Sequence, residues 1–296
     1  SGAMRYFLPV FVDAKTTKIM EQPSLDPRIF FYLGFDGNDR SNFDKLKKET
    51  GNDVLVYCQS PAQLKSAVLE AVALSKIQTD SAELRQDPIA TREFAERLRA
   101  SHVIEKDILG SLTTNTNSNS WYFKGKKLKV SKPADVQNVL SQVLDEIFPL
   151  SPVFKNELIN RDRPSAQAVS ARTKLMEAML QSASLEDLGF EKFPAEKSMY
   201  LALLKATKLH RKINGEFKLI APPKSNEALC AVWSEIEQFM ESTESEASSF
   251  VNLNDVLLAA PYGIKAGVLP ILYLAYYLTN EHEIAVFESR RYCPVL

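Results

Sequence analysis

Hydrophobic and polar positions follow an alternating pattern over the first part of the chain. Between residues 5 and 80, short apolar runs such as RIFFYLGFD and DVLVYCQ are separated by amphipathic segments. The runs have the length and the aromatic and β-branched content of strands, and the segments have helical spacing. The resulting order of strand, strand, helix, strand and helix predicts an α/β layer over residues 5–80.

The layer is expected to end in a helix, and a further helix and a lysine-rich hairpin are predicted after it. The last helix of the layer is expected to begin at Ser60, a suitable N-cap, with Pro61 at its first position. A further long helix is expected from Asp87 to the low-complexity segment TTNTNSNS. The run WYFKGKKLKV then predicts two short strands with Gly125 in the turn. We therefore assign residues 81–133 to a helix and a lysine-rich β-hairpin.

Beyond Pro133 the pattern predicts a loose repeat. Six helices are expected, in two groups of three, over residues 134–148, 165–181, 195–209, 226–242, 252–260 and 266–279. Each group is followed by a strand pair, in RKINGEFKLIAP and in EIAVFESRRYCPV. Three helices and a β-wing form the layout of a winged-helix-like unit, which we assign to residues 134–224 and again to 225–296. The fold class predicted for the whole chain is α+β and mostly helical.

Composition and charge exclude several classes of protein. The 296 residues are 45% hydrophobic and 25% charged, a balance typical of globular proteins and not of disordered or fibrous ones. The net charge is -1, so a basic surface that binds nucleic acid must be a local patch. The apolar run VLPILYLAYYL is too short to cross a bilayer and is expected to form a buried core helix. The three cysteines form no disulfide or metal pattern. We expect a cytoplasmic location and no membrane contact.

No motif for catalysis or cofactor binding is present in the sequence. A Walker A loop needs the pattern GxxxxGKS or GxxxxGKT, whose backbone N–H groups cradle phosphate. The signatures GxGxxG, HExxH and GxSxG are missing too. His102, His210 and His282 are isolated from one another and from cysteine, so packing is a better explanation of them than metal binding. We expect a non-enzymatic chain without a cofactor or metal of its own.

A polar cluster around NELINRDR is the first candidate site. It precedes a helix capped near Ser165, and a polar loop is one explanation of it. An interface or anion contact is the other, because planar guanidinium groups suit bidentate contacts and the segment looks too polar for a core. The candidate contact residues are Asn156, Glu157, Asn160, Arg161, Arg163 and Arg172.

A second candidate site combines the predicted first wing with the lysine hairpin. Winged helices touch the DNA backbone at the end of the third helix and along the wing. A solvated face explains the same charges equally well. The candidate nucleic-acid contacts are Lys205, Lys208, Arg211, Lys212 and Lys218 at the wing, and Lys124, Lys126, Lys127 and Lys129 in the hairpin.

The second half of the chain, residues 149–296, carries a resemblance to a known family. The segments concerned are SPVFKNELINRDRPSAQAVSARTKLMEAML, LGFEKFPAEKSMYLALLKATKLHR, APYGIKAGVLPILYLAYYL and IAVFESRRYCPVL. They resemble the large P-loop ATPases of bacterial phage-defence islands, in particular the BrxC or PglY proteins of BREX systems. One departure is Lys208, which stands where a glycine is expected at a helix end.

The resemblance implies an internal or C-terminal part of a larger defence ATPase, with residues 5–80 continuing from the ATPase core. ATP and Mg²⁺ are then expected only for the full-length parent, because no position here matches the family's Walker A loop. We expect a non-catalytic regulatory or DNA-contacting region. Its expected partners are other defence proteins, further domains of the same polypeptide, and double-stranded DNA.

The alternative is a protein-interaction scaffold with no nucleic-acid contact. It would use the apolar helix 268–278 and the acidic stretch 227–255 as assembly surfaces. No Lys or Arg lies between Lys224 and Lys265, so that stretch repels phosphate and any nucleic-acid contact has to lie elsewhere.

Overall fold

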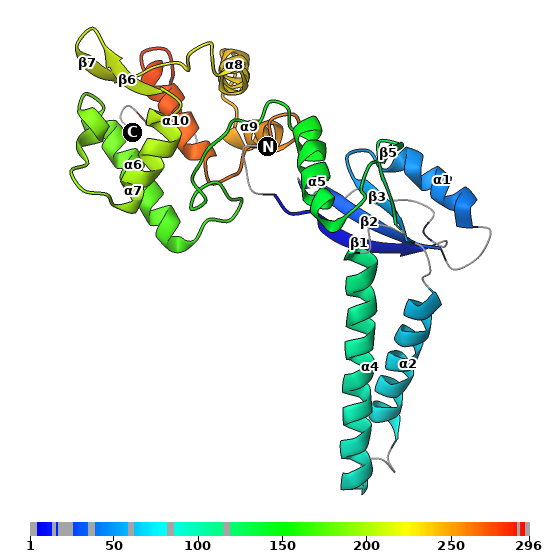
Figure 1. The fold of residues 1–296 in the computed structure, drawn as a ribbon. Coiled ribbons are helices and arrows are strands. Elements are labelled where there is room, and N and C mark those ends of the chain that lie inside the picture. The colour runs from blue at the N-terminus through cyan, green and yellow to red at the C-terminus, as the bar shows by residue number, and fades with distance from the viewer. Residues whose placement is uncertain are drawn as a thin grey trace. The chain divides into compact units, whose positions relative to one another are not determined.

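The computed structural model shows a mixed α/β protein in which helices prevail (Figure 1). It consists of two compact units: residues 6–143, called here the N-terminal unit, and residues 144–296 with residues 1–5, called the C-terminal unit. The predicted α+β, mostly helical class is confirmed at this level. The residues that the structure describes are 5–13, 16, 26–34, 39–58, 62–81, 86–114, 119–288 and 291–293.

A five-stranded sheet organises the N-terminal unit. Its strands, in chain order and in sheet order, are β1 (Leu8–Asp13), β2 (Arg28–Leu33), β3 (Val54–Cys58), β4 (Ser120–Phe123) and β5 (Lys126–Leu128). The first three strands are parallel, and β4 and β5 continue the sheet in antiparallel fashion. Helix α1 (Asp39–Glu49) connects β2 to β3 and packs its buried Phe43 and Leu46 on one face of the sheet.

The predicted order of elements over residues 5–80 is confirmed, but the place of the lysine hairpin is not the expected one. The predicted start of α2 at Ser60 and Pro61 lies outside the described residues. The hairpin β4–β5 was expected to be a separate feature after a helix, whereas β4 pairs with β3 and extends the sheet. This pairing satisfies the backbone groups of β3, which would otherwise be left open at a sheet edge.

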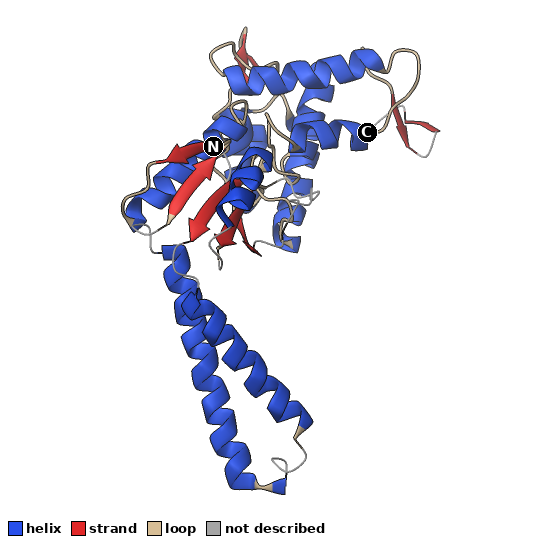
Figure 2. Cartoon of the chain, turned by 90° about the vertical axis from the view of Figure 1, so that its right-hand side faces the viewer, coloured by secondary structure: helices blue, strands red, loops and turns tan. Residues whose placement is uncertain are grey.

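Helices α2 (Ala62–Asp80) and α4 (Pro88–Thr114) lie side by side as a hairpin between β3 and β4 in the sequence (Figure 2). Ala67, Ala71 and Leu74 form the buried side of α2. Each of these two helices covers only one face of the other, so several large apolar side chains remain exposed. These are Leu69, Val72, Ile77, Ile89, Val103 and Ile104.

The C-terminal unit is mostly helical. Its elements are the end of α5 (Pro133–Ile147), α6 (Ala166–Ser182), the short helices η1 (Glu186–Gly189), α7 (Ala195–Tyr200) and η2 (Leu201–Lys205), the hairpin β6 (His210–Ile213) and β7 (Glu216–Leu219), α8 (Glu227–Ser242), α9 (Phe250–Leu258), α10 (Leu269–Thr279), and the hairpin β8 (Val286–Glu288) and β9 (Arg291–Cys293). Six helical segments and both strand pairs thus lie where the pattern predicts them.

One hydrophobic core runs through the C-terminal unit. It contains Leu175 of α6, Leu203 of η2, Ile236 of α8 and Leu272 of α10, all fully buried. The predicted boundary between residues 224 and 225 therefore does not divide the structure. The physical reason is α10, which is apolar on nearly every side and packs against α6, α8 and β7.

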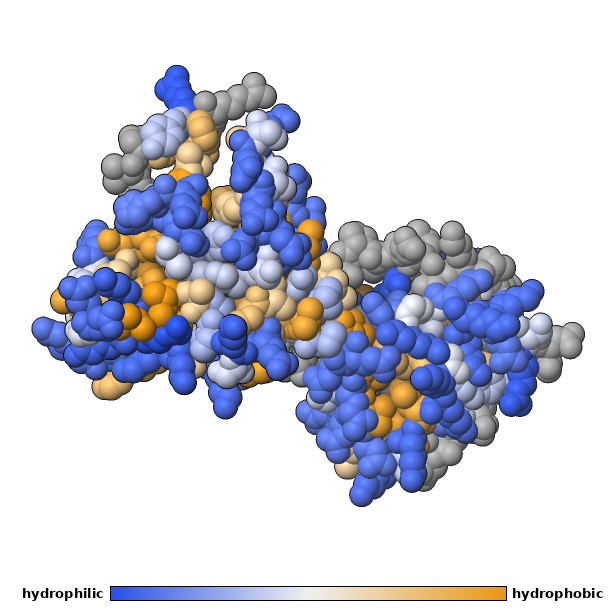
Figure 3. All heavy atoms as spheres, turned by 90° about the horizontal axis from the view of Figure 1, so that it is seen from above, coloured by the Kyte–Doolittle hydropathy of each residue, from blue (hydrophilic) through white to orange (hydrophobic). Residues whose placement is uncertain are grey.

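On the side shown in Figure 3, the exposed hydrophobic side chains form separate patches between hydrophilic ones. In the described ranges, no helix combines the length and the apolar character that crossing a membrane requires. The run VLPILYLAYYL forms most of α10, which confirms the prediction that it is a buried core helix. The scaffold alternative is therefore wrong in using residues 268–278 as an assembly surface, because most of these side chains are buried.

Candidate functional site

Two adjoining depressions lie between α1 and the strands β3, β4 and β5 of the N-terminal unit. The first, called here the aromatic pocket, is a cavity of about 190 Å³ whose lining includes Phe43, Tyr57 and Tyr122. The second, called the lysine groove, shares Asp44 and Lys47 with it and is also lined by Lys48, Lys124, Gly125 and Lys126. The two share Asp44 and Lys47 of α1, with aromatic residues lining the first and four lysines lining the second.

The turn of the β4–β5 hairpin places two lysines beside α1. Lys124 and Gly125 have φ values of 46° and 75°, the pair of left-handed residues that a two-residue type I′ turn requires. A Cβ on Gly125 would lie 3.9 Å from the backbone oxygen of Lys47, so the turn lies next to the last turn of α1. That last turn carries Lys47 and Lys48, whose charges suit a helix C-terminus. The groove therefore collects lysines from two elements about 75 residues apart.

Three aromatic rings form the pocket. The buried Phe43 makes edge-to-face contacts with Tyr57 and Tyr122, at centroid distances of 5.0 and 5.4 Å. Ser120 lies directly opposite Tyr57 in the register of β3 and β4, and its short side chain leaves space between the two tyrosines. A Cβ on Gly34 would lie 3.0 Å from the hydroxyl of Tyr57, so the glycine after β2 makes room for this ring.

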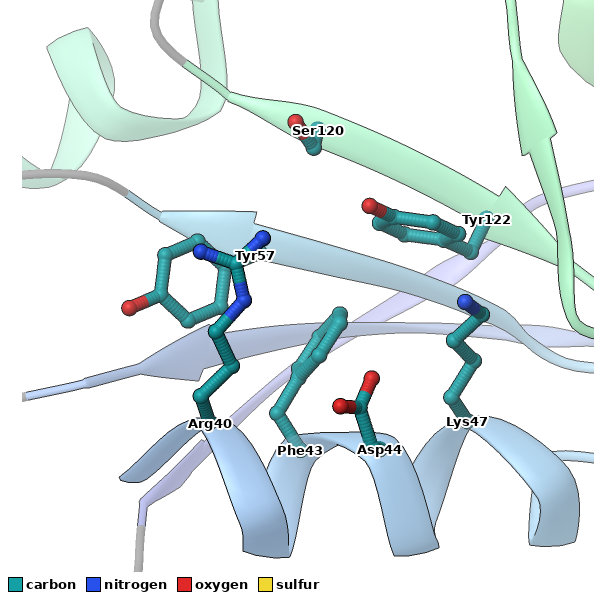
Figure 4. Close-up of a pocket in the computed structure, with 7 residues that line it drawn as sticks. All are labelled: Arg40, Phe43, Asp44, Lys47, Tyr57, Ser120 and Tyr122. Atoms are coloured by element: carbon teal, nitrogen blue, oxygen red, sulfur yellow. The ribbon is translucent and has the colours of Figure 1, made fainter. Parts of the chain in front are cut away.

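Charged groups of α1 surround these rings. Figure 4 shows Arg40 and Lys47 reaching up from α1 toward Tyr57 and Tyr122, with Asp44 between them. The ammonium of Lys47 lies 4.6 Å from the centroid of the Tyr122 ring. The site as a whole carries five cationic side chains against the single carboxylate of Asp44, and its potential therefore favours anions.

The four hairpin lysines that the sequence predicts as nucleic-acid contacts do not all lie in the lysine groove. Lys124 and Lys126 line the groove, and the ammonium of Lys124 lies 5.0 Å from the centroid of the Phe123 ring. Lys127 lies opposite Tyr122 in the register, so it shares the sheet face of the aromatic pocket. Lys129 is exposed just beyond β5. Three of the four thus lie at or near the site.

Three of the five wing residues donate to oxygen atoms inside the C-terminal unit. The Lys205 ammonium donates to Asp187 at 2.6 Å and holds the pKa of that carboxyl below its usual range. Lys218 pairs with Glu216 at 3.0 Å, and Arg211 donates to the backbone oxygen of Lys208 at 2.6 Å. Lys208 and Lys212 are exposed. A phosphate at this wing has to compete with these contacts.

The NELINR segment is less exposed than its polarity predicts. Asn156 and Asn160 are each only 6% exposed. The Asn156 carboxamide oxygen accepts from the backbone N–H groups of Leu158 and Ile159, and the Asn160 amide donates to the backbone oxygen of Phe154. The expectation that the segment is too polar for a core is wrong at these two residues, because both amides satisfy backbone groups of their own loop.

The same segment packs on the loop before α10. Arg172 donates to the backbone oxygen of Gly267 at 3.2 Å, while the N–H of Gly267 donates to the backbone oxygen of Arg161 at 2.9 Å. Burial lowers the pKa of Arg172. These contacts favour an internal role for Arg172 and for the two asparagines. The remaining candidate residues of this cluster are exposed: Glu157, Arg161 and Arg163.

Sequence reasoning missed the half of the site that α1 and the strands supply. Arg40, Lys47 and Lys48 belong to DRSNFDKLKKE, where acidic neighbours mask a cluster of basic residues. Tyr57 and Tyr122 lie in strands whose apolar pattern predicts core. The available signal was the concentration of lysines in the last turn of α1, which marks that helix end as basic.

The chain matches no protein-family model, no curated protein and no solved structure. No cluster of three or more potential metal ligands occurs within the part of the chain that the structure describes.

Proposed function

We propose that this chain is a non-catalytic, nucleic-acid-contacting region of a larger phage-defence ATPase. The observation that carries the contact is the lysine groove, in which α1 and the β4–β5 turn bring Lys47, Lys48, Lys124 and Lys126 to one place. The resemblance of residues 149–296 to the BREX ATPases supports the larger assembly. Because the net charge is -1, binding has to be local and weak.

Phosphate contacts explain why this arrangement of lysines suits nucleic acid. Each phosphate that a lysine neutralises releases condensed counterions, so affinity falls steeply as salt rises. A flexible lysine acts as a point charge and imposes no base sequence. The groove is therefore expected to bind strands without sequence preference.

Replacing three groove lysines tests the proposal. We expect Lys48→Gln, Lys124→Asn and Lys126→Gln together to weaken binding of a labelled oligonucleotide, because three phosphate contacts are lost. The slope of log affinity against log salt should become shallower by about two. Fluorescence anisotropy between about 50 and about 200 mM salt measures both effects.

A matched variant in the wing is the control. Lys208→Gln, Lys212→Gln and Lys218→Gln remove the same charge from the other predicted contact surface, and we expect them to leave affinity and salt dependence unchanged. If the wing variant loses binding and the groove variant keeps it, the groove is not the contact surface.

The second candidate function is a protein-interaction scaffold. The observation that favours it is the apolar surface that α2 and α4 leave exposed, with Leu69 60% exposed and Ile89 74% exposed. Exposed apolar patches on soluble proteins mark interaction surfaces. This function gains support if the unaltered chain binds neither single strands nor duplexes at low salt.

A further inference from the structure

The aromatic pocket has a chemical character different from the groove beside it. Tyr57 and Tyr122 are half-buried, so each ring presents part of its surface to the cavity, and Ser120 leaves the space between them open (Figure 4). Aromatic rings next to lysines are the combination by which proteins hold single strands, since every base has a face that can stack.

The pocket and the groove differ in the charges that surround Asp44. Its exposed carboxylate lines both the aromatic pocket and the groove. The pocket places this carboxylate beside two cations, Arg40 and Lys47, whereas the groove places it beside four lysines, so a phosphate is attracted more strongly to the groove. A base edge offers N–H donors that the carboxylate can accept. The charges therefore direct phosphates to the lysines and a neutral heterocycle to the rings.

We propose that the aromatic pocket takes one unstacked base of a single nucleic-acid strand, while the lysine groove holds the neighbouring phosphates. This inference rests on the proposed function, because the phosphate contacts of the groove bring the strand to the pocket. It adds the class of nucleic acid, which is single-stranded DNA or RNA.

The volume of the aromatic pocket suits a single base and no larger ligand. Its volume of about 190 Å³ is below the roughly 300 to 1,000 Å³ that sites for drug-sized ligands occupy. Bases in a duplex are stacked and paired, and extracting one costs a few kcal/mol, whereas a single strand presents its bases freely. A paired duplex should therefore use the groove alone.

A pair of oligonucleotides separates base insertion from phosphate contact. The first is a labelled single strand of about 12 nucleotides, within the site sizes known for such grooves. The second has the same length and the same phosphates but carries abasic spacers throughout. We expect the unaltered protein to bind the first about tenfold more tightly than the second, because stacking is lost without bases.

Two variants test whether the difference in affinity between the two strands arises in the aromatic pocket. Tyr122→Leu removes a stacking ring, and Ser120→Leu fills the space between the tyrosines. Each should weaken binding of the natural strand about tenfold and leave binding of the abasic strand unchanged. Tyr292→Leu, at a tyrosine that is 60% exposed in the C-terminal unit, is the matched control and should change neither. Melting temperatures show which variants are folded, and the comparison of the two strands on the unaltered protein needs no variant.

The outcomes distinguish the inference from the function on which it rests. Equal, salt-dependent binding of natural and abasic strands would overturn the pocket's role and leave the phosphate groove standing. Tighter binding of duplex than of the natural single strand would also overturn it. Binding of none of these nucleic acids would contradict the proposed function itself.

Discussion

At the scale of a single residue, His210 is held neutral by its surroundings. It is 2% exposed, and its Nε2 lies 2.8 Å from the backbone oxygen of Ala183, which can only accept, so Nε2 carries the proton. Its Nδ1 lies 2.8 Å from the hydroxyl of Tyr200 and accepts from it. Burial lowers the pKa of His210 below its ordinary value.

The lowered pKa of His210 makes the stability of the folded protein depend on pH. Below about pH 6.5 the unfolded chain takes up a proton on His210 that the folded protein excludes, so stability falls as the pH drops through that value. We expect the melting temperature to fall more between about pH 7.5 and about pH 5.5 in the unaltered protein than in His210→Gln. His282→Gln, at a side chain that is 93% exposed, should keep the pH dependence of the unaltered protein. Identical slopes in all three proteins would show that His210 does not contribute.

At the scale of an element, Lys208 ends the helical stretch of α7 and η2. Its φ is 61°, and its N–H donates to the backbone oxygen of Lys205. A left-handed residue at a helix end is a position that favours glycine. The local geometry at this position is thus the one that a glycine would adopt without strain.

Lys208→Gly should therefore stabilise the protein. We expect a gain of roughly 0.5 to 1 kcal/mol, because the strain of the left-handed lysine is larger than the extra chain entropy of glycine. Urea unfolding measures the change. Lys212→Gly, in the middle of β6, should act in the opposite direction, since glycine weakens a strand. A loss of stability in Lys208→Gly would show that the lysine side chain contributes more than its backbone strain costs.

Local features of this kind were accessible from the sequence. The turn at Gly125 is predicted by its residues, and Lys124 and Gly125 adopt the left-handed pair that such a hairpin needs. Asn214 and Gly215 adopt the same kind of pair between β6 and β7. The buried roles of Asn156 and Asn160 were not accessible, because a polar side chain shows no sign of the backbone groups that it will satisfy. Those groups are defined only once the loop is folded.

At the scale of the whole C-terminal unit, one ion pair connects its two halves. The Lys265 side chain is 4% exposed and donates to Asp162 at 2.6 Å, although the two residues are 103 positions apart. Replacing Asp162 removes a charged partner of the buried Lys265 ammonium. Together with the single core, this contact predicts that residues 144–296 respond as one body and not as two winged-helix units.

Asp162→Asn tests this connection. We expect it to lower the free energy of unfolding by about 2 kcal/mol, less than a fully buried pair, because Asp162 remains partly in water. Lys265→Met removes the charge itself and should cost less. Urea unfolding measures both, with the exposed Asp255→Asn as a control that should be neutral. An equal, negligible effect in all three variants would contradict the importance of the pair.

The sequence by itself determined which segments are helices, strands and turns, because these depend on side-chain periodicity, caps and turn residues within a few positions. It also determined that α10 is a core helix and that Lys124 and Lys126 lie on either side of Gly125 in a hairpin. Only the tertiary structure decided that this turn lies beside Lys47 and that Tyr57 and Tyr122 share one pocket. A strand's alternating pattern shows which of its faces is buried but not which strand it pairs with, and β3 and β4 are about 60 residues apart in the chain.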